Sequence, residues 1–254
     1  MTLELYKSEI SGNFYSLRGT SWIVAASLIF SLVAYLLLTD KELSLLDQGE
    51  MLFTLSEIVI SLGTIMAVTS ASSTISTEIE SKTFESLLLT PTSSRQIAFQ
   101  KLLSITTSWF FLYVIAIPYL IAISNGTNLS LSSILYIGIY GTLLVVGFSA
   151  ISIALSAKLK SSKNSVMVAL MVLLIMLAPS IFFATSLKKS SFGMAIENIN
   201  PVSHAMNSLD NVLVDNQQSL FEQASHLLEV SIFAVICLAI LTYSSRRFEV
   251  SPVV

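Results

Sequence analysis

The sequence predicts an all-α membrane protein, from its composition, its long apolar runs and the placement of its basic residues. Hydrophobic residues make up 54% of the chain, charged residues make up only 11%, and the mean hydropathy is +0.78. A soluble domain usually carries about 25% charged residues. Because so few charged residues could not cover the apolar surface in water, we expect lipid to be the solvent.

Six apolar runs are long enough to cross about 30 Å of hydrocarbon at about 1.5 Å per residue. The second run becomes rich in Ser and Thr in its later half, where no Pro or Gly interrupts it, so we expect this helix to continue to about Leu88. Pro118 and Pro179 should kink the third and fifth helices, since proline removes a backbone donor. The six runs are 22–38, 52–70, 102–124, 131–157, 165–185 and 227–243.

The lysines and arginines predict the orientation, because cytoplasmic loops of membrane proteins are enriched in them. Ten of the 13 fall on one side of the predicted membrane, so this side is predicted to be cytoplasmic. We therefore expect a multi-pass protein of the cell membrane with both termini in the cytoplasm. The ten are Lys7, Arg18, Lys82, Arg95, Lys101, Lys158, Lys160, Lys163, Arg246 and Arg247, and the other three are Lys41, Lys188 and Lys189.

Residues 1–19 are expected to form an amphipathic helix in the plane of the headgroups, with Gly19 allowing the chain to turn into the first span. A water-exposed leader is the alternative. One apolar stripe at helical spacing supports the helix. Its members are Leu3, Tyr6, Ile10, Phe14 and Leu17.

Residues 186–226 form the one long loop between spans, on the outer side, and they are too apolar for a solvated linker. Asn200-Pro201 indicates a turn, after which 202–214 can form a short amphipathic helix. We expect this segment to fold back against the outer ends of the spans. A disordered outer loop is the alternative.

Several kinds of chemistry are missing from the sequence. No glycine is followed by lysine, so the phosphate-binding loop that ends in Gly-Lys-Ser or Gly-Lys-Thr is absent, and we expect no ATP hydrolysis by this chain. His204 and His226 are far apart in the sequence and lack acidic neighbours at ligand spacing, so we interpret each as an interfacial polar residue. We expect no cofactor or metal in the chain, and its net charge of −3 indicates no nucleic-acid partner.

The stretch 77–97 lies on the predicted cytoplasmic side, between the second and third spans. We expect a short helix whose apolar face is rimmed by carboxylates, ended by a proline, with Ser93 or Ser94 capping the next helix. Such a face suits a groove on a soluble protein, and a solvated connector is the alternative. The residues assigned to this docking surface are Glu78, Glu80, Thr83, Phe84, Glu85, Leu87, Leu88 and Pro91.

The pattern E-x-E-x-K-T-F-E-x-L-L-x-T-P in this stretch resembles the cytoplasmic coupling loop of type-2 ATP-binding-cassette (ABC) permeases. The resemblance implies a single permease domain over 1–254, with an elbow helix, six spans and outer re-entrant helices. It also implies a separate ATPase subunit that holds ATP and magnesium and contacts the loop. The family usually has glycine at the position of Lys82, so we expect no glycine-dependent bend here.

Glu57 is the one acidic residue that stands out inside a predicted span, where a carboxylate carries a cost of a few kcal/mol. It either reaches the outer headgroups or a neighbouring side chain, or it lines a pathway together with Ser61 and Thr64. The two hydroxyl residues could equally serve helix packing.

The function that these observations favour is the transmembrane subunit of an ABC exporter. A second permease copy, or a related permease, would complete the pathway between the second and fifth spans. The mainly apolar pathway fits an amphipathic peptide, a lipid or a hydrophobic drug better than a small ion. The alternative is a membrane-embedded enzyme, assembly factor, sensor or immunity protein that uses the same scaffold without transport.

Overall fold

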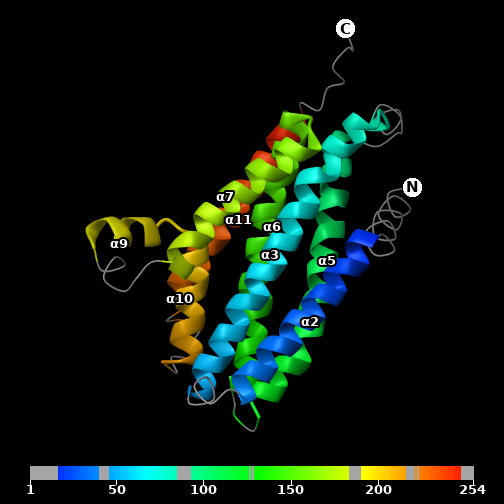
Figure 1. Ribbon diagram of the computed structural model, residues 1–254. Helices are drawn as coiled ribbons and strands as arrows, with labels where there is room; N and C mark the ends of the chain where they lie inside the picture. The colour runs from blue at the N-terminus through cyan, green and yellow to red at the C-terminus, as the bar shows by residue number, and fades with distance from the viewer. Residues whose placement is uncertain are drawn as a thin grey trace.

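The computed structural model describes residues 17–39, 46–84, 93–125, 127, 129–182, 190–215, 221 and 223–246. Within these ranges the regular structure is entirely helical (Figure 1). The helices are α2 (Leu17–Thr39), α3 (Gln48–Glu80), α5 (Ser94–Ile123), α6 (Leu129–Leu159), α7 (Ser162–Phe182), α9 (Ser191–Glu197), α10 (Pro201–Leu213) and α11 (Ala224–Ser245).

Six of these helices, α2, α3, α5, α6, α7 and α11, are long and apolar enough to cross a membrane. They run up and down in one elongated bundle (Figure 1). Each contains one of the six predicted runs, so the prediction of an all-α protein with six spans is confirmed.

Helices α3 and α6 lie at the centre of the bundle. The most apolar window of each is 61% and 56% buried, against 22–28% in the other four spans. Their composition accounts for this position, since both carry many hydroxyl side chains and lipid offers these no hydrogen-bond partner. In α3 the hydroxyls of Thr69 and Thr74 donate to the carbonyls of Ile65 and Ser70, four residues earlier, at 2.9 and 2.7 Å.

Trp109 of α5 sets the spacing of the central helices. It is 1% exposed, and its Nε1 donates to Thr142 Oγ1 at 3.0 Å. Its ring fills the space left by two glycines, because a Cβ would lie 2.2 Å from the ring at Gly63 of α3 and 2.3 Å from it at Gly141 of α6. Three spans therefore meet around one indole ring.

Helix α3 ends at Glu80, so the prediction that it continues to about Leu88 is wrong. Lys82 adopts a left-handed conformation, with a φ of 58°. Its N–H donates to Ile79 O at 3.1 Å, and the Thr83 N–H donates to Glu78 O at 3.0 Å. This pair of bonds is the Schellman helix ending, which usually has glycine where Lys82 stands. The bend is therefore present, although the residue that forms it is a lysine.

The predicted elbow helix lies mostly outside the described residues, which begin at Leu17. Gly19 falls within α2 instead of at a turn, so the expectation that the chain turns there is wrong. Helix α2 starts two residues before that glycine.

The expected helix in the outer segment is α10, which packs against α3, α6, α7 and α11. Asn200 caps it by accepting from Val202 N at 3.0 Å, and Pro201 occupies its first turn. The Asn200 side chain also donates to Met176 O of α7 at 2.6 Å. The prediction of a packed amphipathic helix is thus confirmed for 201–213, whereas re-entry into a membrane stays a prediction.

Alanine at Gly63 should destabilise the bundle by roughly 1–3 kcal/mol, because its methyl group would overlap the Trp109 ring. The matched control is Gly138→Ala, whose Cβ would meet the far end of the Tyr113 side chain at 3.0 Å. Thermal unfolding of both variants in the same detergent measures the difference. Equal melting temperatures would show that the indole does not set the helix spacing.

Candidate functional site

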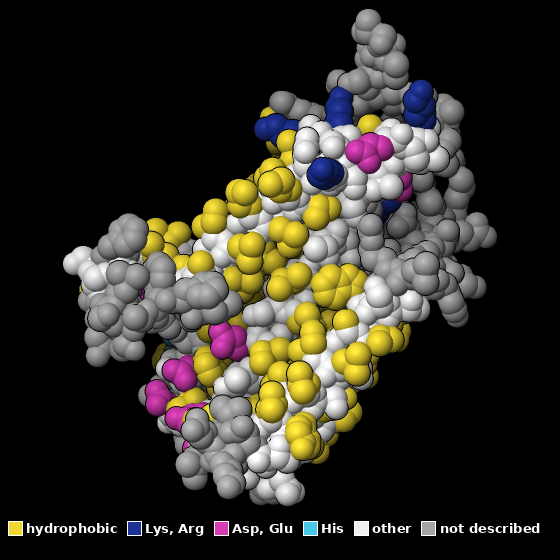
Figure 2. Space-filling model, viewed as in Figure 1, with side chains coloured by type: hydrophobic (Ala, Val, Ile, Leu, Met, Phe, Trp, Pro, Cys, Tyr) yellow, Lys and Arg dark blue, Asp and Glu magenta, His cyan; other side chains and the backbone are white. Residues whose placement is uncertain are grey.

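Charged side chains are separated between the two ends of the bundle (Figure 2). Each lysine or arginine side chain that the structure describes lies where α3 ends and α5 and α7 begin, and we call this the basic end. The acidic side chains gather at the opposite, acidic end, with Glu78 and Glu80 as exceptions. The described side chains at the basic end are Lys82, Arg95, Lys101, Lys158, Lys160, Lys163 and Arg246.

The first exception, Glu78, is tied to α5. Its Oε1 accepts from Lys101 Nζ at 2.6 Å. Lys101 is 3% exposed and Glu78 is 22% exposed, so this ion pair is largely shielded from water. Lys101 lies in the buried stripe of α5 between Ile97 and Ile105, where a charged group needs a partner of opposite sign.

The second exception, Glu80, is tied to α7. Its Oε1 accepts from the backbone N–H of Ser162, the first residue of α7, at 2.9 Å. A carboxylate at this position satisfies an orphan donor and meets the positive end of the helix dipole. Thr77 adds a hydroxyl contact to Ser162 Oγ at 3.3 Å. We call Glu78, Glu80, Lys101 and Ser162 the α3 junction.

Helix α6 contacts α3 just before this junction. The backbone N–H groups of Ile75 and Ser76 donate to Ser156 Oγ at 3.1 and 2.9 Å. Ser156 Oγ in turn donates to Ser76 Oγ at 3.1 Å. Ser156 thereby joins α6 to the backbone of α3 about one turn before Glu80.

The structure changes the interpretation of the predicted docking surface. Glu78 and Glu80 bind the chain's own α5 and α7, instead of forming an open rim. Phe84 is 5% exposed and packs in the core, so the prediction that it presents a bare apolar face is wrong. Thr83 is exposed. The other four assigned residues, Glu85, Leu87, Leu88 and Pro91, lie outside the described part of the chain.

The start of α5 agrees with the prediction. Ser93 Oγ accepts from Gln96 N at 3.3 Å, and Gln96 Oε1 accepts from Ser93 N at 3.0 Å. This is a capping box, which satisfies two orphan donors of the helix.

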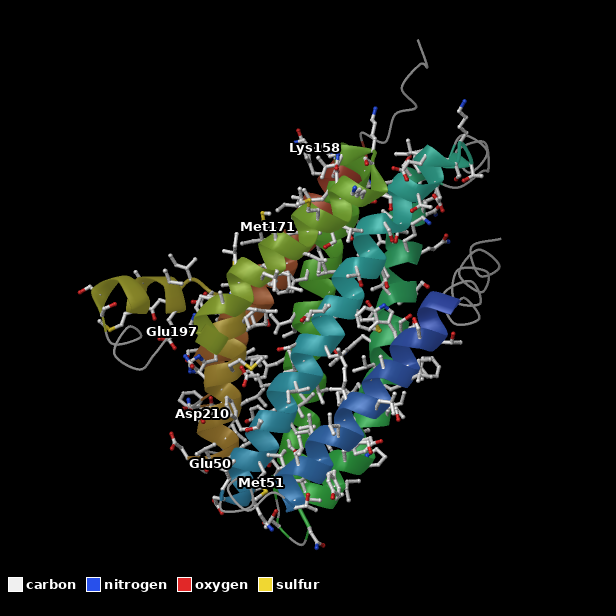
Figure 3. All side chains as sticks on the ribbon, in the orientation of Figure 1. Glu50, Met51, Lys158, Met171, Glu197 and Asp210 are labelled. Carbon is white, nitrogen blue, oxygen red and sulfur yellow. The ribbon has the colours of Figure 1, made fainter. Side chains whose placement is uncertain are left out.

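At the acidic end, Glu57 lines a small pocket of about 140 Å³ between α3, α9 and α10. Two other carboxylates share its lining, Glu197 and Asp210, which are labelled in Figure 3. Glu197 also accepts from Asn207 Nδ2 at 3.1 Å. The remaining lining residues are Phe53, Ser203, Met206 and Asn207.

Ser61 and Thr64 do not line this pocket. Thr64 is 1% exposed, and its hydroxyl donates to the Ser61 carbonyl at 2.9 Å. Ser61 Oγ is buried and has no hydrogen-bond partner within the described residues. The two hydroxyls thus face the packed interior of the single chain, while Glu57 faces a cavity.

The two histidines, which the sequence separates by 22 positions, meet in the structure. His204 Nδ1 and His226 Nδ1 lie 3.0 Å apart, and His204 Nε2 lies 3.0 Å from Asn198 O. The two histidines thus form a pair that joins α10 to α11, which the sequence did not indicate. The described residues contain no group of three or more His, Cys, Asp or Glu side chains placed to hold a metal ion.

The six long apolar helices define a polytopic membrane protein. Residues 6–251 match the family described as "ABC-2 family transporter protein", and the chain belongs to this family. This confirms the resemblance to type-2 ABC permeases. The search among curated proteins gave no match.

Sequence reasoning missed two residues of the junction, Lys101 and Ser162, and one residue that contacts α3 next to it, Ser156. A usable signal existed for Lys101, which lies three and four residues after the apolar positions Ala98 and Ile97. A cation inside an apolar stripe predicts an acidic partner. Neither serine gives such a signal, because serine is frequent in all these helices.

The Glu78–Lys101 pair should show measurable coupling in a double-mutant cycle of Glu78→Gln and Lys101→Met. We expect a coupling free energy of roughly 1–3 kcal/mol, between the values for exposed and fully buried pairs. Unfolding of the three variants in one detergent gives this quantity, and the exposed Lys163→Met is the control for charge removal at the same end. If the two substitutions lower the free energy of unfolding additively, the ion pair does not hold α3 to α5.

Proposed function

We propose that the chain is the membrane-spanning subunit of an ATP-driven exporter and that separate ATPase subunits bind at its basic end. The α3 junction is the observation that carries this proposal. Glu78 and Glu80 join the last turn of α3 to α5 and α7, so a force on the 77–97 loop acts on three spans together. Family membership supports the transport role.

The proposal places the basic end in the cytoplasm, with both termini on that side. The distribution of described lysines and arginines supports this orientation. A second copy of the chain, or a related permease, completes the pathway along the second and fifth spans, which are α3 and α7. The pocket around Glu57 then opens toward the outer side, next to α3.

The docking site can be tested with Glu85→Arg, which reverses a charge in the loop. This variant should reduce co-purification of the proposed ATPase subunit, because rim charges govern association between partners. Glu50→Arg is the matched control, since Glu50 is exposed and lies at the acidic end of α3. Phe84→Asp is unsuitable here, because the buried Phe84 would disturb the fold.

Equal recovery of the ATPase with Glu85→Arg and Glu50→Arg would contradict the docking site. Absence of any ATPase partner for the wild-type chain would favour the sensor or immunity alternative. These outcomes are distinguishable, because in the first the ATPase still co-purifies with both variants, and in the second no ATPase co-purifies even with the wild-type chain.

Glu57→Gln tests the role of the acidic pocket in transport. If cargo contacts this carboxylate, the apparent cargo affinity in stimulated ATP hydrolysis should fall roughly tenfold, as expected for losing one charge-assisted hydrogen bond. The melting temperature and basal hydrolysis should stay close to wild type, since glutamine keeps the shape. Glu50→Gln serves as the control, and unchanged stimulation in Glu57→Gln would leave this residue a purely structural role.

A further inference from the structure

A groove of about 590 Å³ lies between the ends of α6 and α11 at the basic end. It lies apart from the α3 junction, because none of the four junction residues lines it. Figure 3 labels Lys158 at this end of the bundle. The lining residues are Ile151, Ala154, Leu155, Ala157, Lys158, Lys160, Ile240, Tyr243 and Ser244.

The walls of this groove are apolar, and the charged side chains that line it are both lysines. Ile240 of α11 is 45% exposed, so the apolar wall is accessible from outside the bundle. Lys158 and Lys160 are both exposed, and the hydroxyls of Tyr243 and Ser244 complete the polar side. The described lining contains no Asp or Glu, so its net charge is positive.

The groove is continuous with surface that faces lipid. On the same helix, one to two turns further into the span, Val235 and Ile236 are 64% and 54% exposed. Exposed apolar side chains on a spanning helix contact acyl chains, whereas Lys158 lies in the last turn of α6 and Lys160 directly after it, at headgroup level. The second and fifth spans, proposed to form the pathway, contribute no lining residue.

We propose that this groove binds one anionic phospholipid, with its phosphate at Lys158 and Lys160 and an acyl chain along Leu155 and Ile240. Basic pockets between spanning helices attract anionic headgroups, and an amine-to-phosphate bond is charge-assisted. The apolar wall selects a lipid over a soluble anion, because a free phosphate would leave that wall uncovered. The assignment requires only that the chain spans a membrane, so it does not depend on the proposed coupling to an ATPase.

The test uses the full chain in detergent, with phosphatidylglycerol and phosphatidylcholine of identical acyl chains as probes. Native mass spectrometry should show tighter binding of phosphatidylglycerol, which should also raise the melting temperature more than phosphatidylcholine does. The double variant Lys158→Gln/Lys160→Gln should bind phosphatidylglycerol roughly tenfold or more weakly than the wild type. Its affinity for phosphatidylcholine should be unchanged. Lys163→Gln removes one positive charge at the same end of the bundle but outside the groove. This variant should keep the preference for phosphatidylglycerol.

A preference that survives in the double variant, or that Lys163→Gln abolishes equally, would overturn the site. Inorganic phosphate that displaces phosphatidylglycerol at equal concentration would show a soluble anion as the ligand instead. A loss of dimers in the double variant, measured by light scattering, would show that a second copy covers the groove. Ile240→Trp fills the groove without changing its charge, so phosphatidylglycerol binding that is unaffected by this variant would also refute the proposal.

Discussion

The contact of one indole ring with two glycines determines how closely the three inner helices approach. Trp109 is wedged where Gly63 and Gly141 leave no side chain, and its N–H is satisfied by Thr142. A membrane span gains little from excluding water, so close packing and internal hydrogen bonds must hold the bundle together. The remaining elements are arranged around this contact, with α2 and α11 on the outside and α10 at one end.

The same lack of water explains the chemistry of the basic end. Glu78 and Lys101 neutralise each other in a mostly buried position, and Glu80 completes the first turn of α7. Glu78 thereby neutralises a buried charge that packed apolar side chains could not, whereas Glu80 makes its contact at an exposed position. The last turn of α3 is thus anchored to α5 and α7.

Patterns with a local physical cause could be predicted from the sequence, and contacts between distant residues could not. The six spans follow from run length, the cap at Ser93 follows from side-chain chemistry next to a helix start, and the turn at Asn200 follows from the proline after it. The end of α3 was missed because Lys82 takes a conformation that usually indicates glycine. The pairs Glu78–Lys101 and His204–His226 depend on which helices become neighbours, and single-sequence periodicity does not contain that information.

The position of the tryptophan contact along α3 has a mechanical consequence. Gly63 lies one residue from the middle of this 33-residue helix, which is about 50 Å long. If α3 tilts about Gly63, its two ends move in opposite directions. About 5° of rotation displaces each end by about 2 Å. One end holds Glu78 and Glu80, while Gly49 at the other packs against the Leu213 carbonyl of α10. When α3 tilts as a rigid rod, an inward displacement of the end that holds Glu78 and Glu80 therefore accompanies an outward displacement of the end at Gly49.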